Sequence, residues 1–221
     1  MNYLAHALHC LDDPYQVAGV ATPDWLGLTR PRLRCRSRHA RPWTAAPDPT
    51  MASFARGVVQ HHADDDWFHQ TAAFGELAME LARQVREVTA DADGMRPSFL
   101  GHILVELLLD ATIAQETPEA LDRYYEALAA VDARQIATSV GLMTGSDASQ
   151  LGPIIAKFCE LRFLYDYADD DRLLLRLNQV MRRVGLPELP QGFTTMLPGA
   201  RRLVADRQAA LRTPESVLAA Q

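Results

Sequence analysis

The residues that dominate the periodic segments of this chain are strong helix formers, and this limits its fold more than any other feature. Leu, Ala, Glu, Arg and Met make up most of these segments, and no stretch alternates Val, Ile or Thr with polar residues for long. The pattern predicts an all-α protein. A chain of 221 residues can bury a sizeable core as one domain. We therefore expect residues 1–221 to form a single helical bundle of eight or nine helices.

The apolar periodicity predicts where these helices lie. They are expected at Asn2–Cys10, Met51–His69, Thr71–Ala90, Ser98–Glu116, Pro118–Val131, Ala133–Thr144, Leu151–Tyr167, Asp170–Val184 and Pro198–Arg212. Ser98 and Thr117 are expected to cap two of the starts, each beside a proline. Residues 28–50 contain four prolines and no helical stripe, which predicts a long irregular loop. Residues 213–221 are expected to be a frayed tail.

Charge and cysteine usage narrow the class of protein. The formal net charge of −6 gives no global reason to bind nucleic acid. Cys10, Cys35 and Cys159 form no CxxC pair, which fits reduced thiols rather than a zinc knuckle. The first residues lack the basic start and clean apolar stretch of a secretory signal, and the longest apolar run falls short of a bilayer span. We expect a cytoplasmic protein that does not span a membrane.

The histidines are unevenly distributed, since all seven fall within the first 102 residues. His61, Asp65 and His69 follow one another at steps of four, which places them along one face of a helix. Neutral imidazole and carboxylate are the usual ligands of Zn, Mn and Fe(II), and one-turn spacing lets neighbours reach the same ion. The alternative is a solvated acidic face, because Asp64, Asp65 and Asp66 run together.

A second predicted helix has the same spacing of histidine and carboxylate residues, with His102, Glu106 and Asp110 again at steps of four. Apolar residues surround this stripe on nearly every side, so the helix is expected in the centre of the protein. An unpaired buried carboxylate costs several kcal/mol unless a cation or hydrogen-bond partners compensate it. These residues are therefore candidate metal ligands. The alternatives are structural ion pairs with arginine, or a stripe that faces water.

Short motifs link these residues to a known family. The opening MNYLAHALHCL, with His6, is followed by a short segment that ends at Asp24. This opening resembles that of the acyl carrier protein phosphodiesterase family. The next two motifs are similar as well, through Gly57, His61, Asp65 and Trp67 and then through Gly101, Glu106 and Asp110. The likeness covers about the first 115 residues.

The resemblance implies an all-helical, HD-domain-like fold and a metal-dependent reaction. The family hydrolyses the phosphodiester between a phosphopantetheine arm and a carrier-protein serine, with a divalent ion such as Mn or Mg. His6, Asp24, His61 and Asp65 match the family pattern best. The chain departs from that pattern at His62, at His69 and at Ala111, which follows Asp110 where the family has a histidine. These departures predict a divergent relative.

The combined interpretation is a metal-dependent phosphohydrolase, most simply a phosphodiesterase, whose site lies in the N-terminal half while the C-terminal half is a scaffold. One or two divalent ions (Mn, Zn, Fe or Mg) are expected at His6, Asp24, His61, Asp65, His69, His102, Glu106 and Asp110. Asp65 and His62 are the candidates for proton transfer. Two alternatives remain: a non-catalytic helical binding module with structural ion pairs, and a zinc-dependent phospholipase-like hydrolase.

An arginine-rich segment follows Asp24. It has six arginines within twelve residues, at positions 30, 32, 34, 36, 38 and 41. Arg32, Arg34 and Arg36 are the candidates for binding the substrate, either a small phosphodiester or an acidic carrier protein, because guanidinium groups pair with phosphate and carboxylate. Nucleic acid is a weaker candidate, since no aromatic residues are interleaved for base stacking. The alternative is a solvated loop.

Overall fold

The computed structural model describes residues 1–89 and 93–212, and in these residues it has helices and turns but no strand. The prediction of an all-α, single-domain protein is confirmed. The α-helices are α1 (Tyr3–Ala7), α2 (Pro14–Leu26), α3 (Ser37–Ala40), α4 (Pro49–Gln70), α5 (Ala72–Val88), α6 (Pro97–Glu116), α7 (Pro118–Ala129), α8 (Ala133–Thr144), α9 (Leu151–Leu161), α10 (Asp170–Arg183) and α11 (Leu197–Arg207). The 3-10 helices are η1 (Arg41–Trp43), η2 (Phe163–Ala168), η3 (Gln191–Met196) and η4 (Gln208–Ala210). The predicted tail at 213–221 and the predicted helix end at Ala90 lie outside the described residues.

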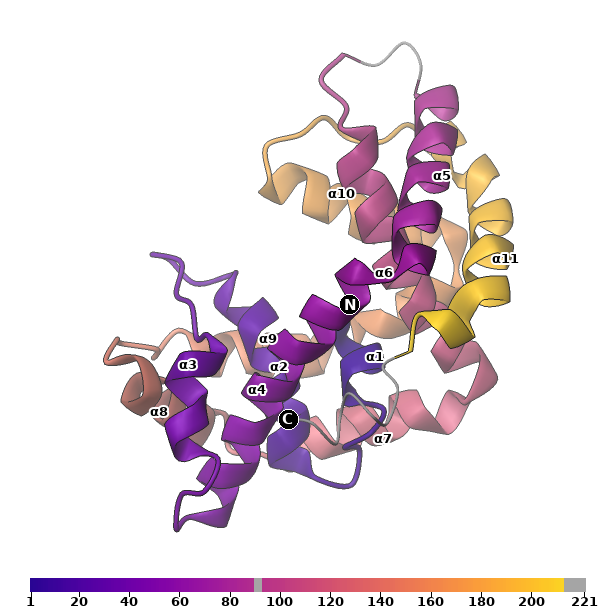
Figure 1. The fold of residues 1–221 in the computed structure, drawn as a ribbon. Helices are drawn as coiled ribbons and strands as arrows, with labels where there is room; N and C mark the ends of the chain where they lie inside the picture. Colours follow the sequence, from indigo (N-terminus) through magenta and orange to yellow (C-terminus); the bar gives the residue numbers. More distant parts are fainter. Residues whose placement is uncertain (90–92, 213–221) are drawn as a thin grey trace.

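Two helix pairs form the frame of the molecule (Figure 1). Helix α5 follows α4 directly in the chain. Thr71 ends α4, and its hydroxyl caps α5 by accepting a hydrogen bond from the Phe74 amide. Helix α2 packs along α4, and α6 packs along α5. The short helix α1 lies in the middle and contacts α2, α4, α6 and α7. This arrangement places the residues of α1 between the two pairs.

Glycines set the distance between the paired helices. A Cβ on Gly19 of α2 would lie 2.3 Å from the carbonyl oxygen of Phe54, and a Cβ on Gly57 of α4 would lie 2.3 Å from that of Gln16. In the second pair, a Cβ on Gly101 of α6 would lie 2.3 Å from the carbonyl oxygen of Ala78. Real Cβ atoms do not approach backbone so closely, so both crossings require glycine.

The stretch before α4 differs from its prediction. Helix α2 was not expected, although Asp13 caps it by accepting a hydrogen bond from the Gln16 amide and Pro14 occupies its first turn. The prediction of an irregular loop over 28–50 is wrong for residues 37–43, which form α3 and η1. At the start of α3 the Arg36 amide donates to Nδ1 of His39, and the His39 amide donates to the carbonyl oxygen of Arg36.

Two predicted helix ends and two predicted caps also differ. The predicted helix Leu151–Tyr167 is broken at Arg162, whose φ of 43° ends α9 before the chain continues as η2. The last predicted helix ends at Arg207 and continues as η4. Neither expected cap forms, because α6 begins after Arg96 rather than at Ser98, and the Thr117 side chain makes no cap hydrogen bond.

Helix α6 has the length and composition of a membrane-spanning helix, with a mean hydropathy of 1.4 over its most apolar window. The sequence analysis did not expect any segment to reach that length. However, 61% of this window is buried inside the protein. The apolar surface of α6 is therefore used as the centre of the bundle, as expected from its sequence.

Candidate metal centre

The first group of candidate ligands, here called the inner group, consists of His6, His61 and Asp65. Helix α1 supplies His6, and α4 supplies the other two. The Nε2 atom of His6 lies 3.4 Å from Oδ1 of Asp65, and Nε2 of His61 lies 3.5 Å from Oδ2 of the same carboxylate. The two imidazole rings are stacked with their centroids 4.3 Å apart. The inner group is buried on the histidine side and partly open at Asp65.

The second group, here called the outer group, consists of His69, His102 and Glu106. It joins the end of α4 to α6. Oε1 of Glu106 lies 3.2 Å from Nε2 of each histidine, and the two rings are stacked with their centroids 4.8 Å apart. Both histidines are more exposed than those of the inner group. The described residues thus contain two groups of similar composition, one buried and one facing solvent.

The α-amino group of Met1 connects the two groups. It donates hydrogen bonds to Oδ1 of Asp65 at 2.8 Å and to Oε1 of Glu106 at 3.0 Å. Met1 is almost completely buried, so this ammonium compensates two carboxylates inside the protein. The inner and outer groups therefore form one continuous charged cluster.

The Nδ1 atoms of His6 and His61 face away from Asp65, and their polar partners orient the two imidazole rings. Nδ1 of His61 donates to the carbonyl oxygen of Val20 at 2.8 Å, which leaves Nε2 as the nitrogen that faces Asp65. Nδ1 of His6 lies 3.2 Å from Oδ2 of Asp64, and Gln60 donates to that same oxygen. A carboxylate or carbonyl behind the ring is the usual support of a metal-binding histidine. Nε2 of His6 is buried and has no hydrogen-bond partner.

Burial and charge shift the pKa values around this cluster. Burial alone lowers the pKa of His6, but the carboxylates of Asp64 and Asp65 beside its two ring nitrogens outweigh this effect and raise the pKa to about 9. Burial and the nearby charge of His6 lower the pKa of His61 well below its ordinary value. Burial opposes ionisation of Asp65 and Glu106, yet the ammonium and the histidines hold both pKa values below their ordinary range. Burial raises the pKa of Asp24 to about 7.

The donor set and its spacing fit a divalent metal ion. In each group the ligand atoms lie within 4.8 Å of one another. Zinc–nitrogen and zinc–oxygen bonds of about 2.0–2.1 Å in a tetrahedral site separate neighbouring ligand atoms by about 3.3 Å. The nitrogen–oxygen separations of 3.2–3.5 Å in the two groups are close to this value.

Asp110, a predicted ligand, is not brought into either group. Its oxygens accept hydrogen bonds from the side-chain amide of Asn2 and from the backbone amides of Leu4 and Ala5, at 2.8–3.0 Å. Burial raises its pKa to about 6, although the two backbone hydrogen bonds oppose the shift. Asp110 therefore caps α1 from the neighbouring helix.

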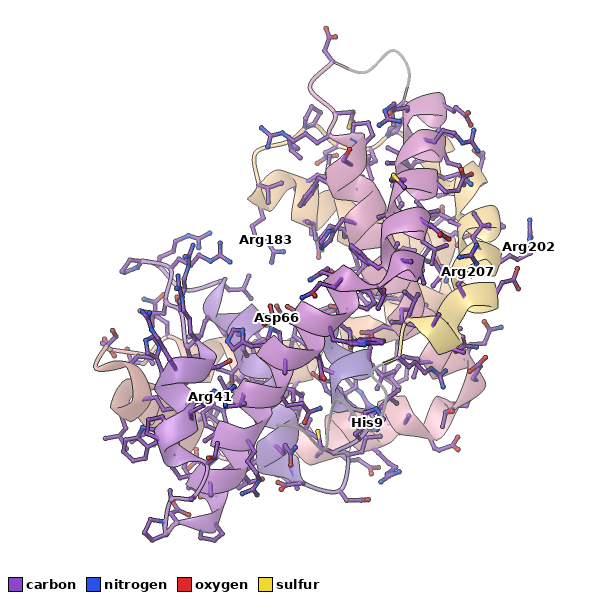
Figure 2. All side chains as sticks on the ribbon, in the orientation of Figure 1. His9, Arg41, Asp66, Arg183, Arg202 and Arg207 are labelled. Atoms are coloured by element: carbon purple, nitrogen blue, oxygen red, sulfur yellow. The ribbon has the colours of Figure 1, made fainter. Side chains whose placement is uncertain are left out.

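The change Asp110→Asn tests this structural role. It keeps the size of the side chain but presents a donor where three buried donors converge. We expect it to lower the free energy of unfolding by about 1–2 kcal/mol and to leave metal content unchanged. Thermal melting and elemental analysis measure the two effects, with exposed Asp66→Asn as the control (Figure 2). A loss of metal without a loss of stability would instead make Asp110 a ligand.

The other predicted site residues surround the cluster. Asp24 is in neither group but lines a cavity of about 550 Å³ that also contacts Met1 and Glu106. Nε2 of His62 donates to the carbonyl oxygen of Cys35 at 2.8 Å, and its ring lies edge-on to His61. Arg32 lines the same cavity as Asp24. Arg34 and Arg36 are exposed and do not line it.

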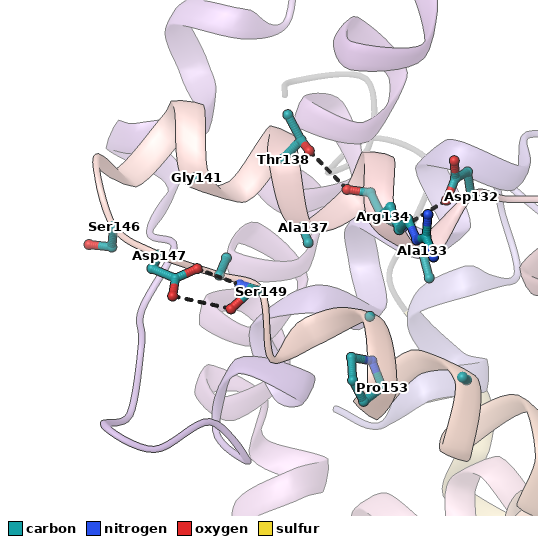
Figure 3. Close-up of a pocket in the computed structure, with 13 residues that line it drawn as sticks. Asp132, Ala133, Arg134, Ala137, Thr138, Gly141, Ser146, Asp147, Ser149 and Pro153 are labelled. Carbon is teal, nitrogen blue, oxygen red and sulfur yellow. Dashed lines mark hydrogen bonds between the residues drawn. The ribbon is translucent and has the colours of Figure 1, made fainter.

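A second cavity, of about 740 Å³, lies between α8 and α9 (Figure 3). Its lining is mostly small side chains, including Ala137, Gly141 and Ala156, and it contains no predicted site residue. Asp147, which also lines it, accepts hydrogen bonds from the amide and hydroxyl of Ser149. The candidate chemistry is therefore concentrated at the smaller cavity.

Sequence analysis did not identify three contributors to the centre. Asp64 was assigned to a possible solvated acidic face, but it is 1% exposed and supports His6. The ammonium of Met1 was not considered as a cation. Arg183 lines the cavity from α10, in the half of the chain expected to act only as a scaffold. Of the three, only Asp64 could have been suspected from the sequence. It is next to the predicted ligand Asp65, and it lies one helical turn from Gln60, which can hydrogen-bond to it.

Comparison with known proteins adds no assignment. The chain matches no protein-family model, no curated protein and no solved structure. The function has to be argued from the two groups and the cavity beside them.

Proposed function

We propose that this chain is a metal-dependent phosphohydrolase, most simply a phosphodiesterase. One observation carries the proposal. Because Nδ1 of His61 donates to a carbonyl oxygen, Nε2 of the neutral ring presents a lone pair toward the Asp65 carboxylate, 3.5 Å away. A lone pair that faces a carboxylate oxygen at the edge of a buried site is unfavourable unless a cation lies between them, and the Met1 ammonium contacts Oδ1 of Asp65 rather than the Oδ2 that His61 faces. His6, His61 and Asp65 would hold one divalent ion, and His69, His102 and Glu106 would hold a second.

The surrounding residues suit hydrolysis of a phosphoester. A divalent ion acidifies a coordinated water and withdraws charge from phosphoryl oxygens. Arg32 lines the same cavity as Glu106, and a guanidinium group pairs well with a phosphate oxygen. With a pKa of about 7, the carboxyl group of Asp24 can hold or release a proton near neutral pH at the same cavity.

Hydrolysis of bis(p-nitrophenyl) phosphate tests this function. Chelator-treated protein is expected to be inactive, and Mn²⁺ is expected to restore turnover, because the carboxylates alone cannot neutralise the charge that develops on phosphoryl oxygens. Release of p-nitrophenol, followed with and without added Mn²⁺, Zn²⁺ and Mg²⁺, is the measurement. Equal rates with and without every ion, in protein shown to bind metal, would reject hydrolysis of this substrate class.

A second candidate is the non-catalytic binding module. The Met1 ammonium favours it, because this group already compensates Asp65 and Glu106 without a metal. In that case the histidines and carboxylates would be structural ion pairs, and the melting temperature would not respond to chelation or to added ions. If the chain is the phosphohydrolase, adding Mn²⁺ should raise the melting temperature.

The resemblance to the acyl carrier protein phosphodiesterase family suggests a more specific substrate than a general phosphodiester. A phosphopantetheine-type diester on an acidic carrier protein would bring its phosphate to Arg32 and its negative surface to the exposed arginines of residues 30–41. Release of phosphopantetheine from a carrier protein, compared with hydrolysis of a phospholipid, separates this substrate from that of a phospholipase-like hydrolase.

A further inference from the structure

The cavity beside the metal centre is built from both halves of the chain. Met1, Asp24 and Glu106 lie on its wall next to the ligand groups. The segment after α2 contributes Arg30 and Arg32, and α9, η2 and α10 close the other side. Its volume of about 550 Å³ lies within the range of small-molecule sites. The C-terminal half therefore contributes a wall as well as support.

The charges on this wall favour an anion. Four arginines line the cavity. Arg176 is already paired with Asp166 at 2.5 Å, whereas Arg30, Arg32 and Arg183 have no carboxylate within 4.0 Å among the described residues. Of the two carboxylates on the wall, Glu106 is contacted by Met1 and by two histidines. Three arginines without a carboxylate partner among the described residues therefore line the cavity together with one remaining carboxylate, that of Asp24.

The direction of Arg183 can be compared with that of two arginines of α11 (Figure 2). Figure 2 shows Arg183 projecting from α10 toward the middle of the molecule, on the side of α4. Arg202 and Arg207 project from α11 on another side. Arg207 is paired there with Glu76. Arg183 thus lines the cavity, whereas Arg202 and Arg207 do not.

Much of the remaining wall is apolar. Leu161 and Val184 line the cavity with 44% and 48% of their surfaces exposed, although large apolar side chains are normally buried. Phe158 and Phe163 continue this surface inward. Contiguous apolar surface inside a cavity provides binding energy for an apolar part of a ligand.

We propose that this cavity binds a phosphoester whose organic group is apolar. Arg32 and Arg183 pair with the phosphate, which lies at the Glu106 end of the cavity, and Leu161, Val184 and Phe163 contact the organic group. The inference rests on the proposed function, because the adjoining metal centre gives the phosphate its chemistry. Beyond the proposed function, it names the residues that bind the substrate and the apolar character of the organic group.

Binding of phenylphosphonate, which cannot be hydrolysed, tests the cavity separately from catalysis. Calorimetric titration is carried out on the full chain with and without Mn²⁺, and inorganic phosphate is titrated in parallel. We expect phenylphosphonate to bind at least about tenfold more tightly than inorganic phosphate, because only its ring contacts the apolar wall.

Substitutions then separate the two parts of the cavity. Arg183→Gln and Arg32→Gln should each weaken both ligands about tenfold, since each removes a charge-assisted pair. Leu161→Asn should weaken phenylphosphonate several-fold and leave inorganic phosphate unchanged. Arg202→Gln is the matched control and should bind both ligands like the unchanged chain. Melting curves establish that each variant is folded. Because Arg32 and Arg183 lie in different parts of the fold, a folded variant of either one is enough to test whether an arginine binds the phosphate.

Two results would overturn the proposal: equal affinity for phenylphosphonate and inorganic phosphate, or unchanged affinities in both arginine variants. The test is independent of the proposed function. If the chain binds no metal but phenylphosphonate binding still depends on Arg183, the cavity assignment stands and the hydrolase is rejected. If Mn²⁺-dependent hydrolysis is found but neither ligand responds to the substitutions, the hydrolase stands and the cavity assignment fails.

Discussion

Replacement of His61 by alanine is expected to remove metal from the inner group and to slow phosphodiester hydrolysis by about a hundredfold to a thousandfold, the range seen when a group that stabilises transition-state charge is lost. His61 is 3% exposed, and its Nε2 atom is held toward Asp65 by the hydrogen bond to Val20. Metal content and turnover should therefore fall together.

Two further variants make this result specific. Asp64→Asn keeps the inner ligands but weakens the support behind His6, so metal affinity should fall by about tenfold to a hundredfold. His9→Ala changes an exposed histidine outside both groups and should have no effect (Figure 2). Activity retained in His61→Ala at the level of the unchanged chain would exclude the inner group from the reaction.

The second large effect is expected at the crossing of α2 and α4. A methyl group at Gly57 would lie 2.3 Å from the Gln16 carbonyl oxygen and 2.8 Å from the Gly19 Cα, so Gly57→Ala forces the helices apart. Overpacking of this kind costs about 3 kcal/mol of the free energy of unfolding. For a chain of this size, that corresponds to a melting temperature lower by about 6–12 °C.

A matched glycine provides the control for this prediction. Gly75 lies within α5, and a Cβ there would meet no atom within 4 Å. Gly75→Ala should therefore stabilise the protein by up to about 1 kcal/mol, because alanine is the better helix former. Calorimetric melting of both variants is the measurement. A Gly57→Ala chain that melts at or above the unchanged protein would show that the crossing does not need glycine.

The sequence predicted the helical class and most of the helices because apolar periodicity is a local property. It also placed His61 and Asp65 correctly on one face of α4. The same periodicity does not predict which residues of other helices contact that face. His69 shares the stripe, but it lies two turns further along α4 and pairs with His102 and Glu106 of α6.

Tertiary packing explains the residues that the sequence did not assign correctly or did not reveal. Asp110 continues the stripe of Glu106, yet the start of α1 packs against it and takes up both of its oxygens. Asp64 appears polar and solvated in sequence, but α1 covers it. Arg183 follows Asp24 by more than 150 positions, and only the return of α10 to the cavity brings the two together.

Metal content is the most direct test of the central claim that these histidines and carboxylates form a metal centre. Elemental analysis of tag-free protein, before and after incubation with Mn, Zn or Fe(II), should find about one or two divalent ions per chain, one for each group. The His6→Ala and His61→Ala variants should lose the inner ion. Less than about a tenth of an ion per chain, unchanged by incubation with any of these metals, would contradict the account, since ligand sets of this kind bind them tightly.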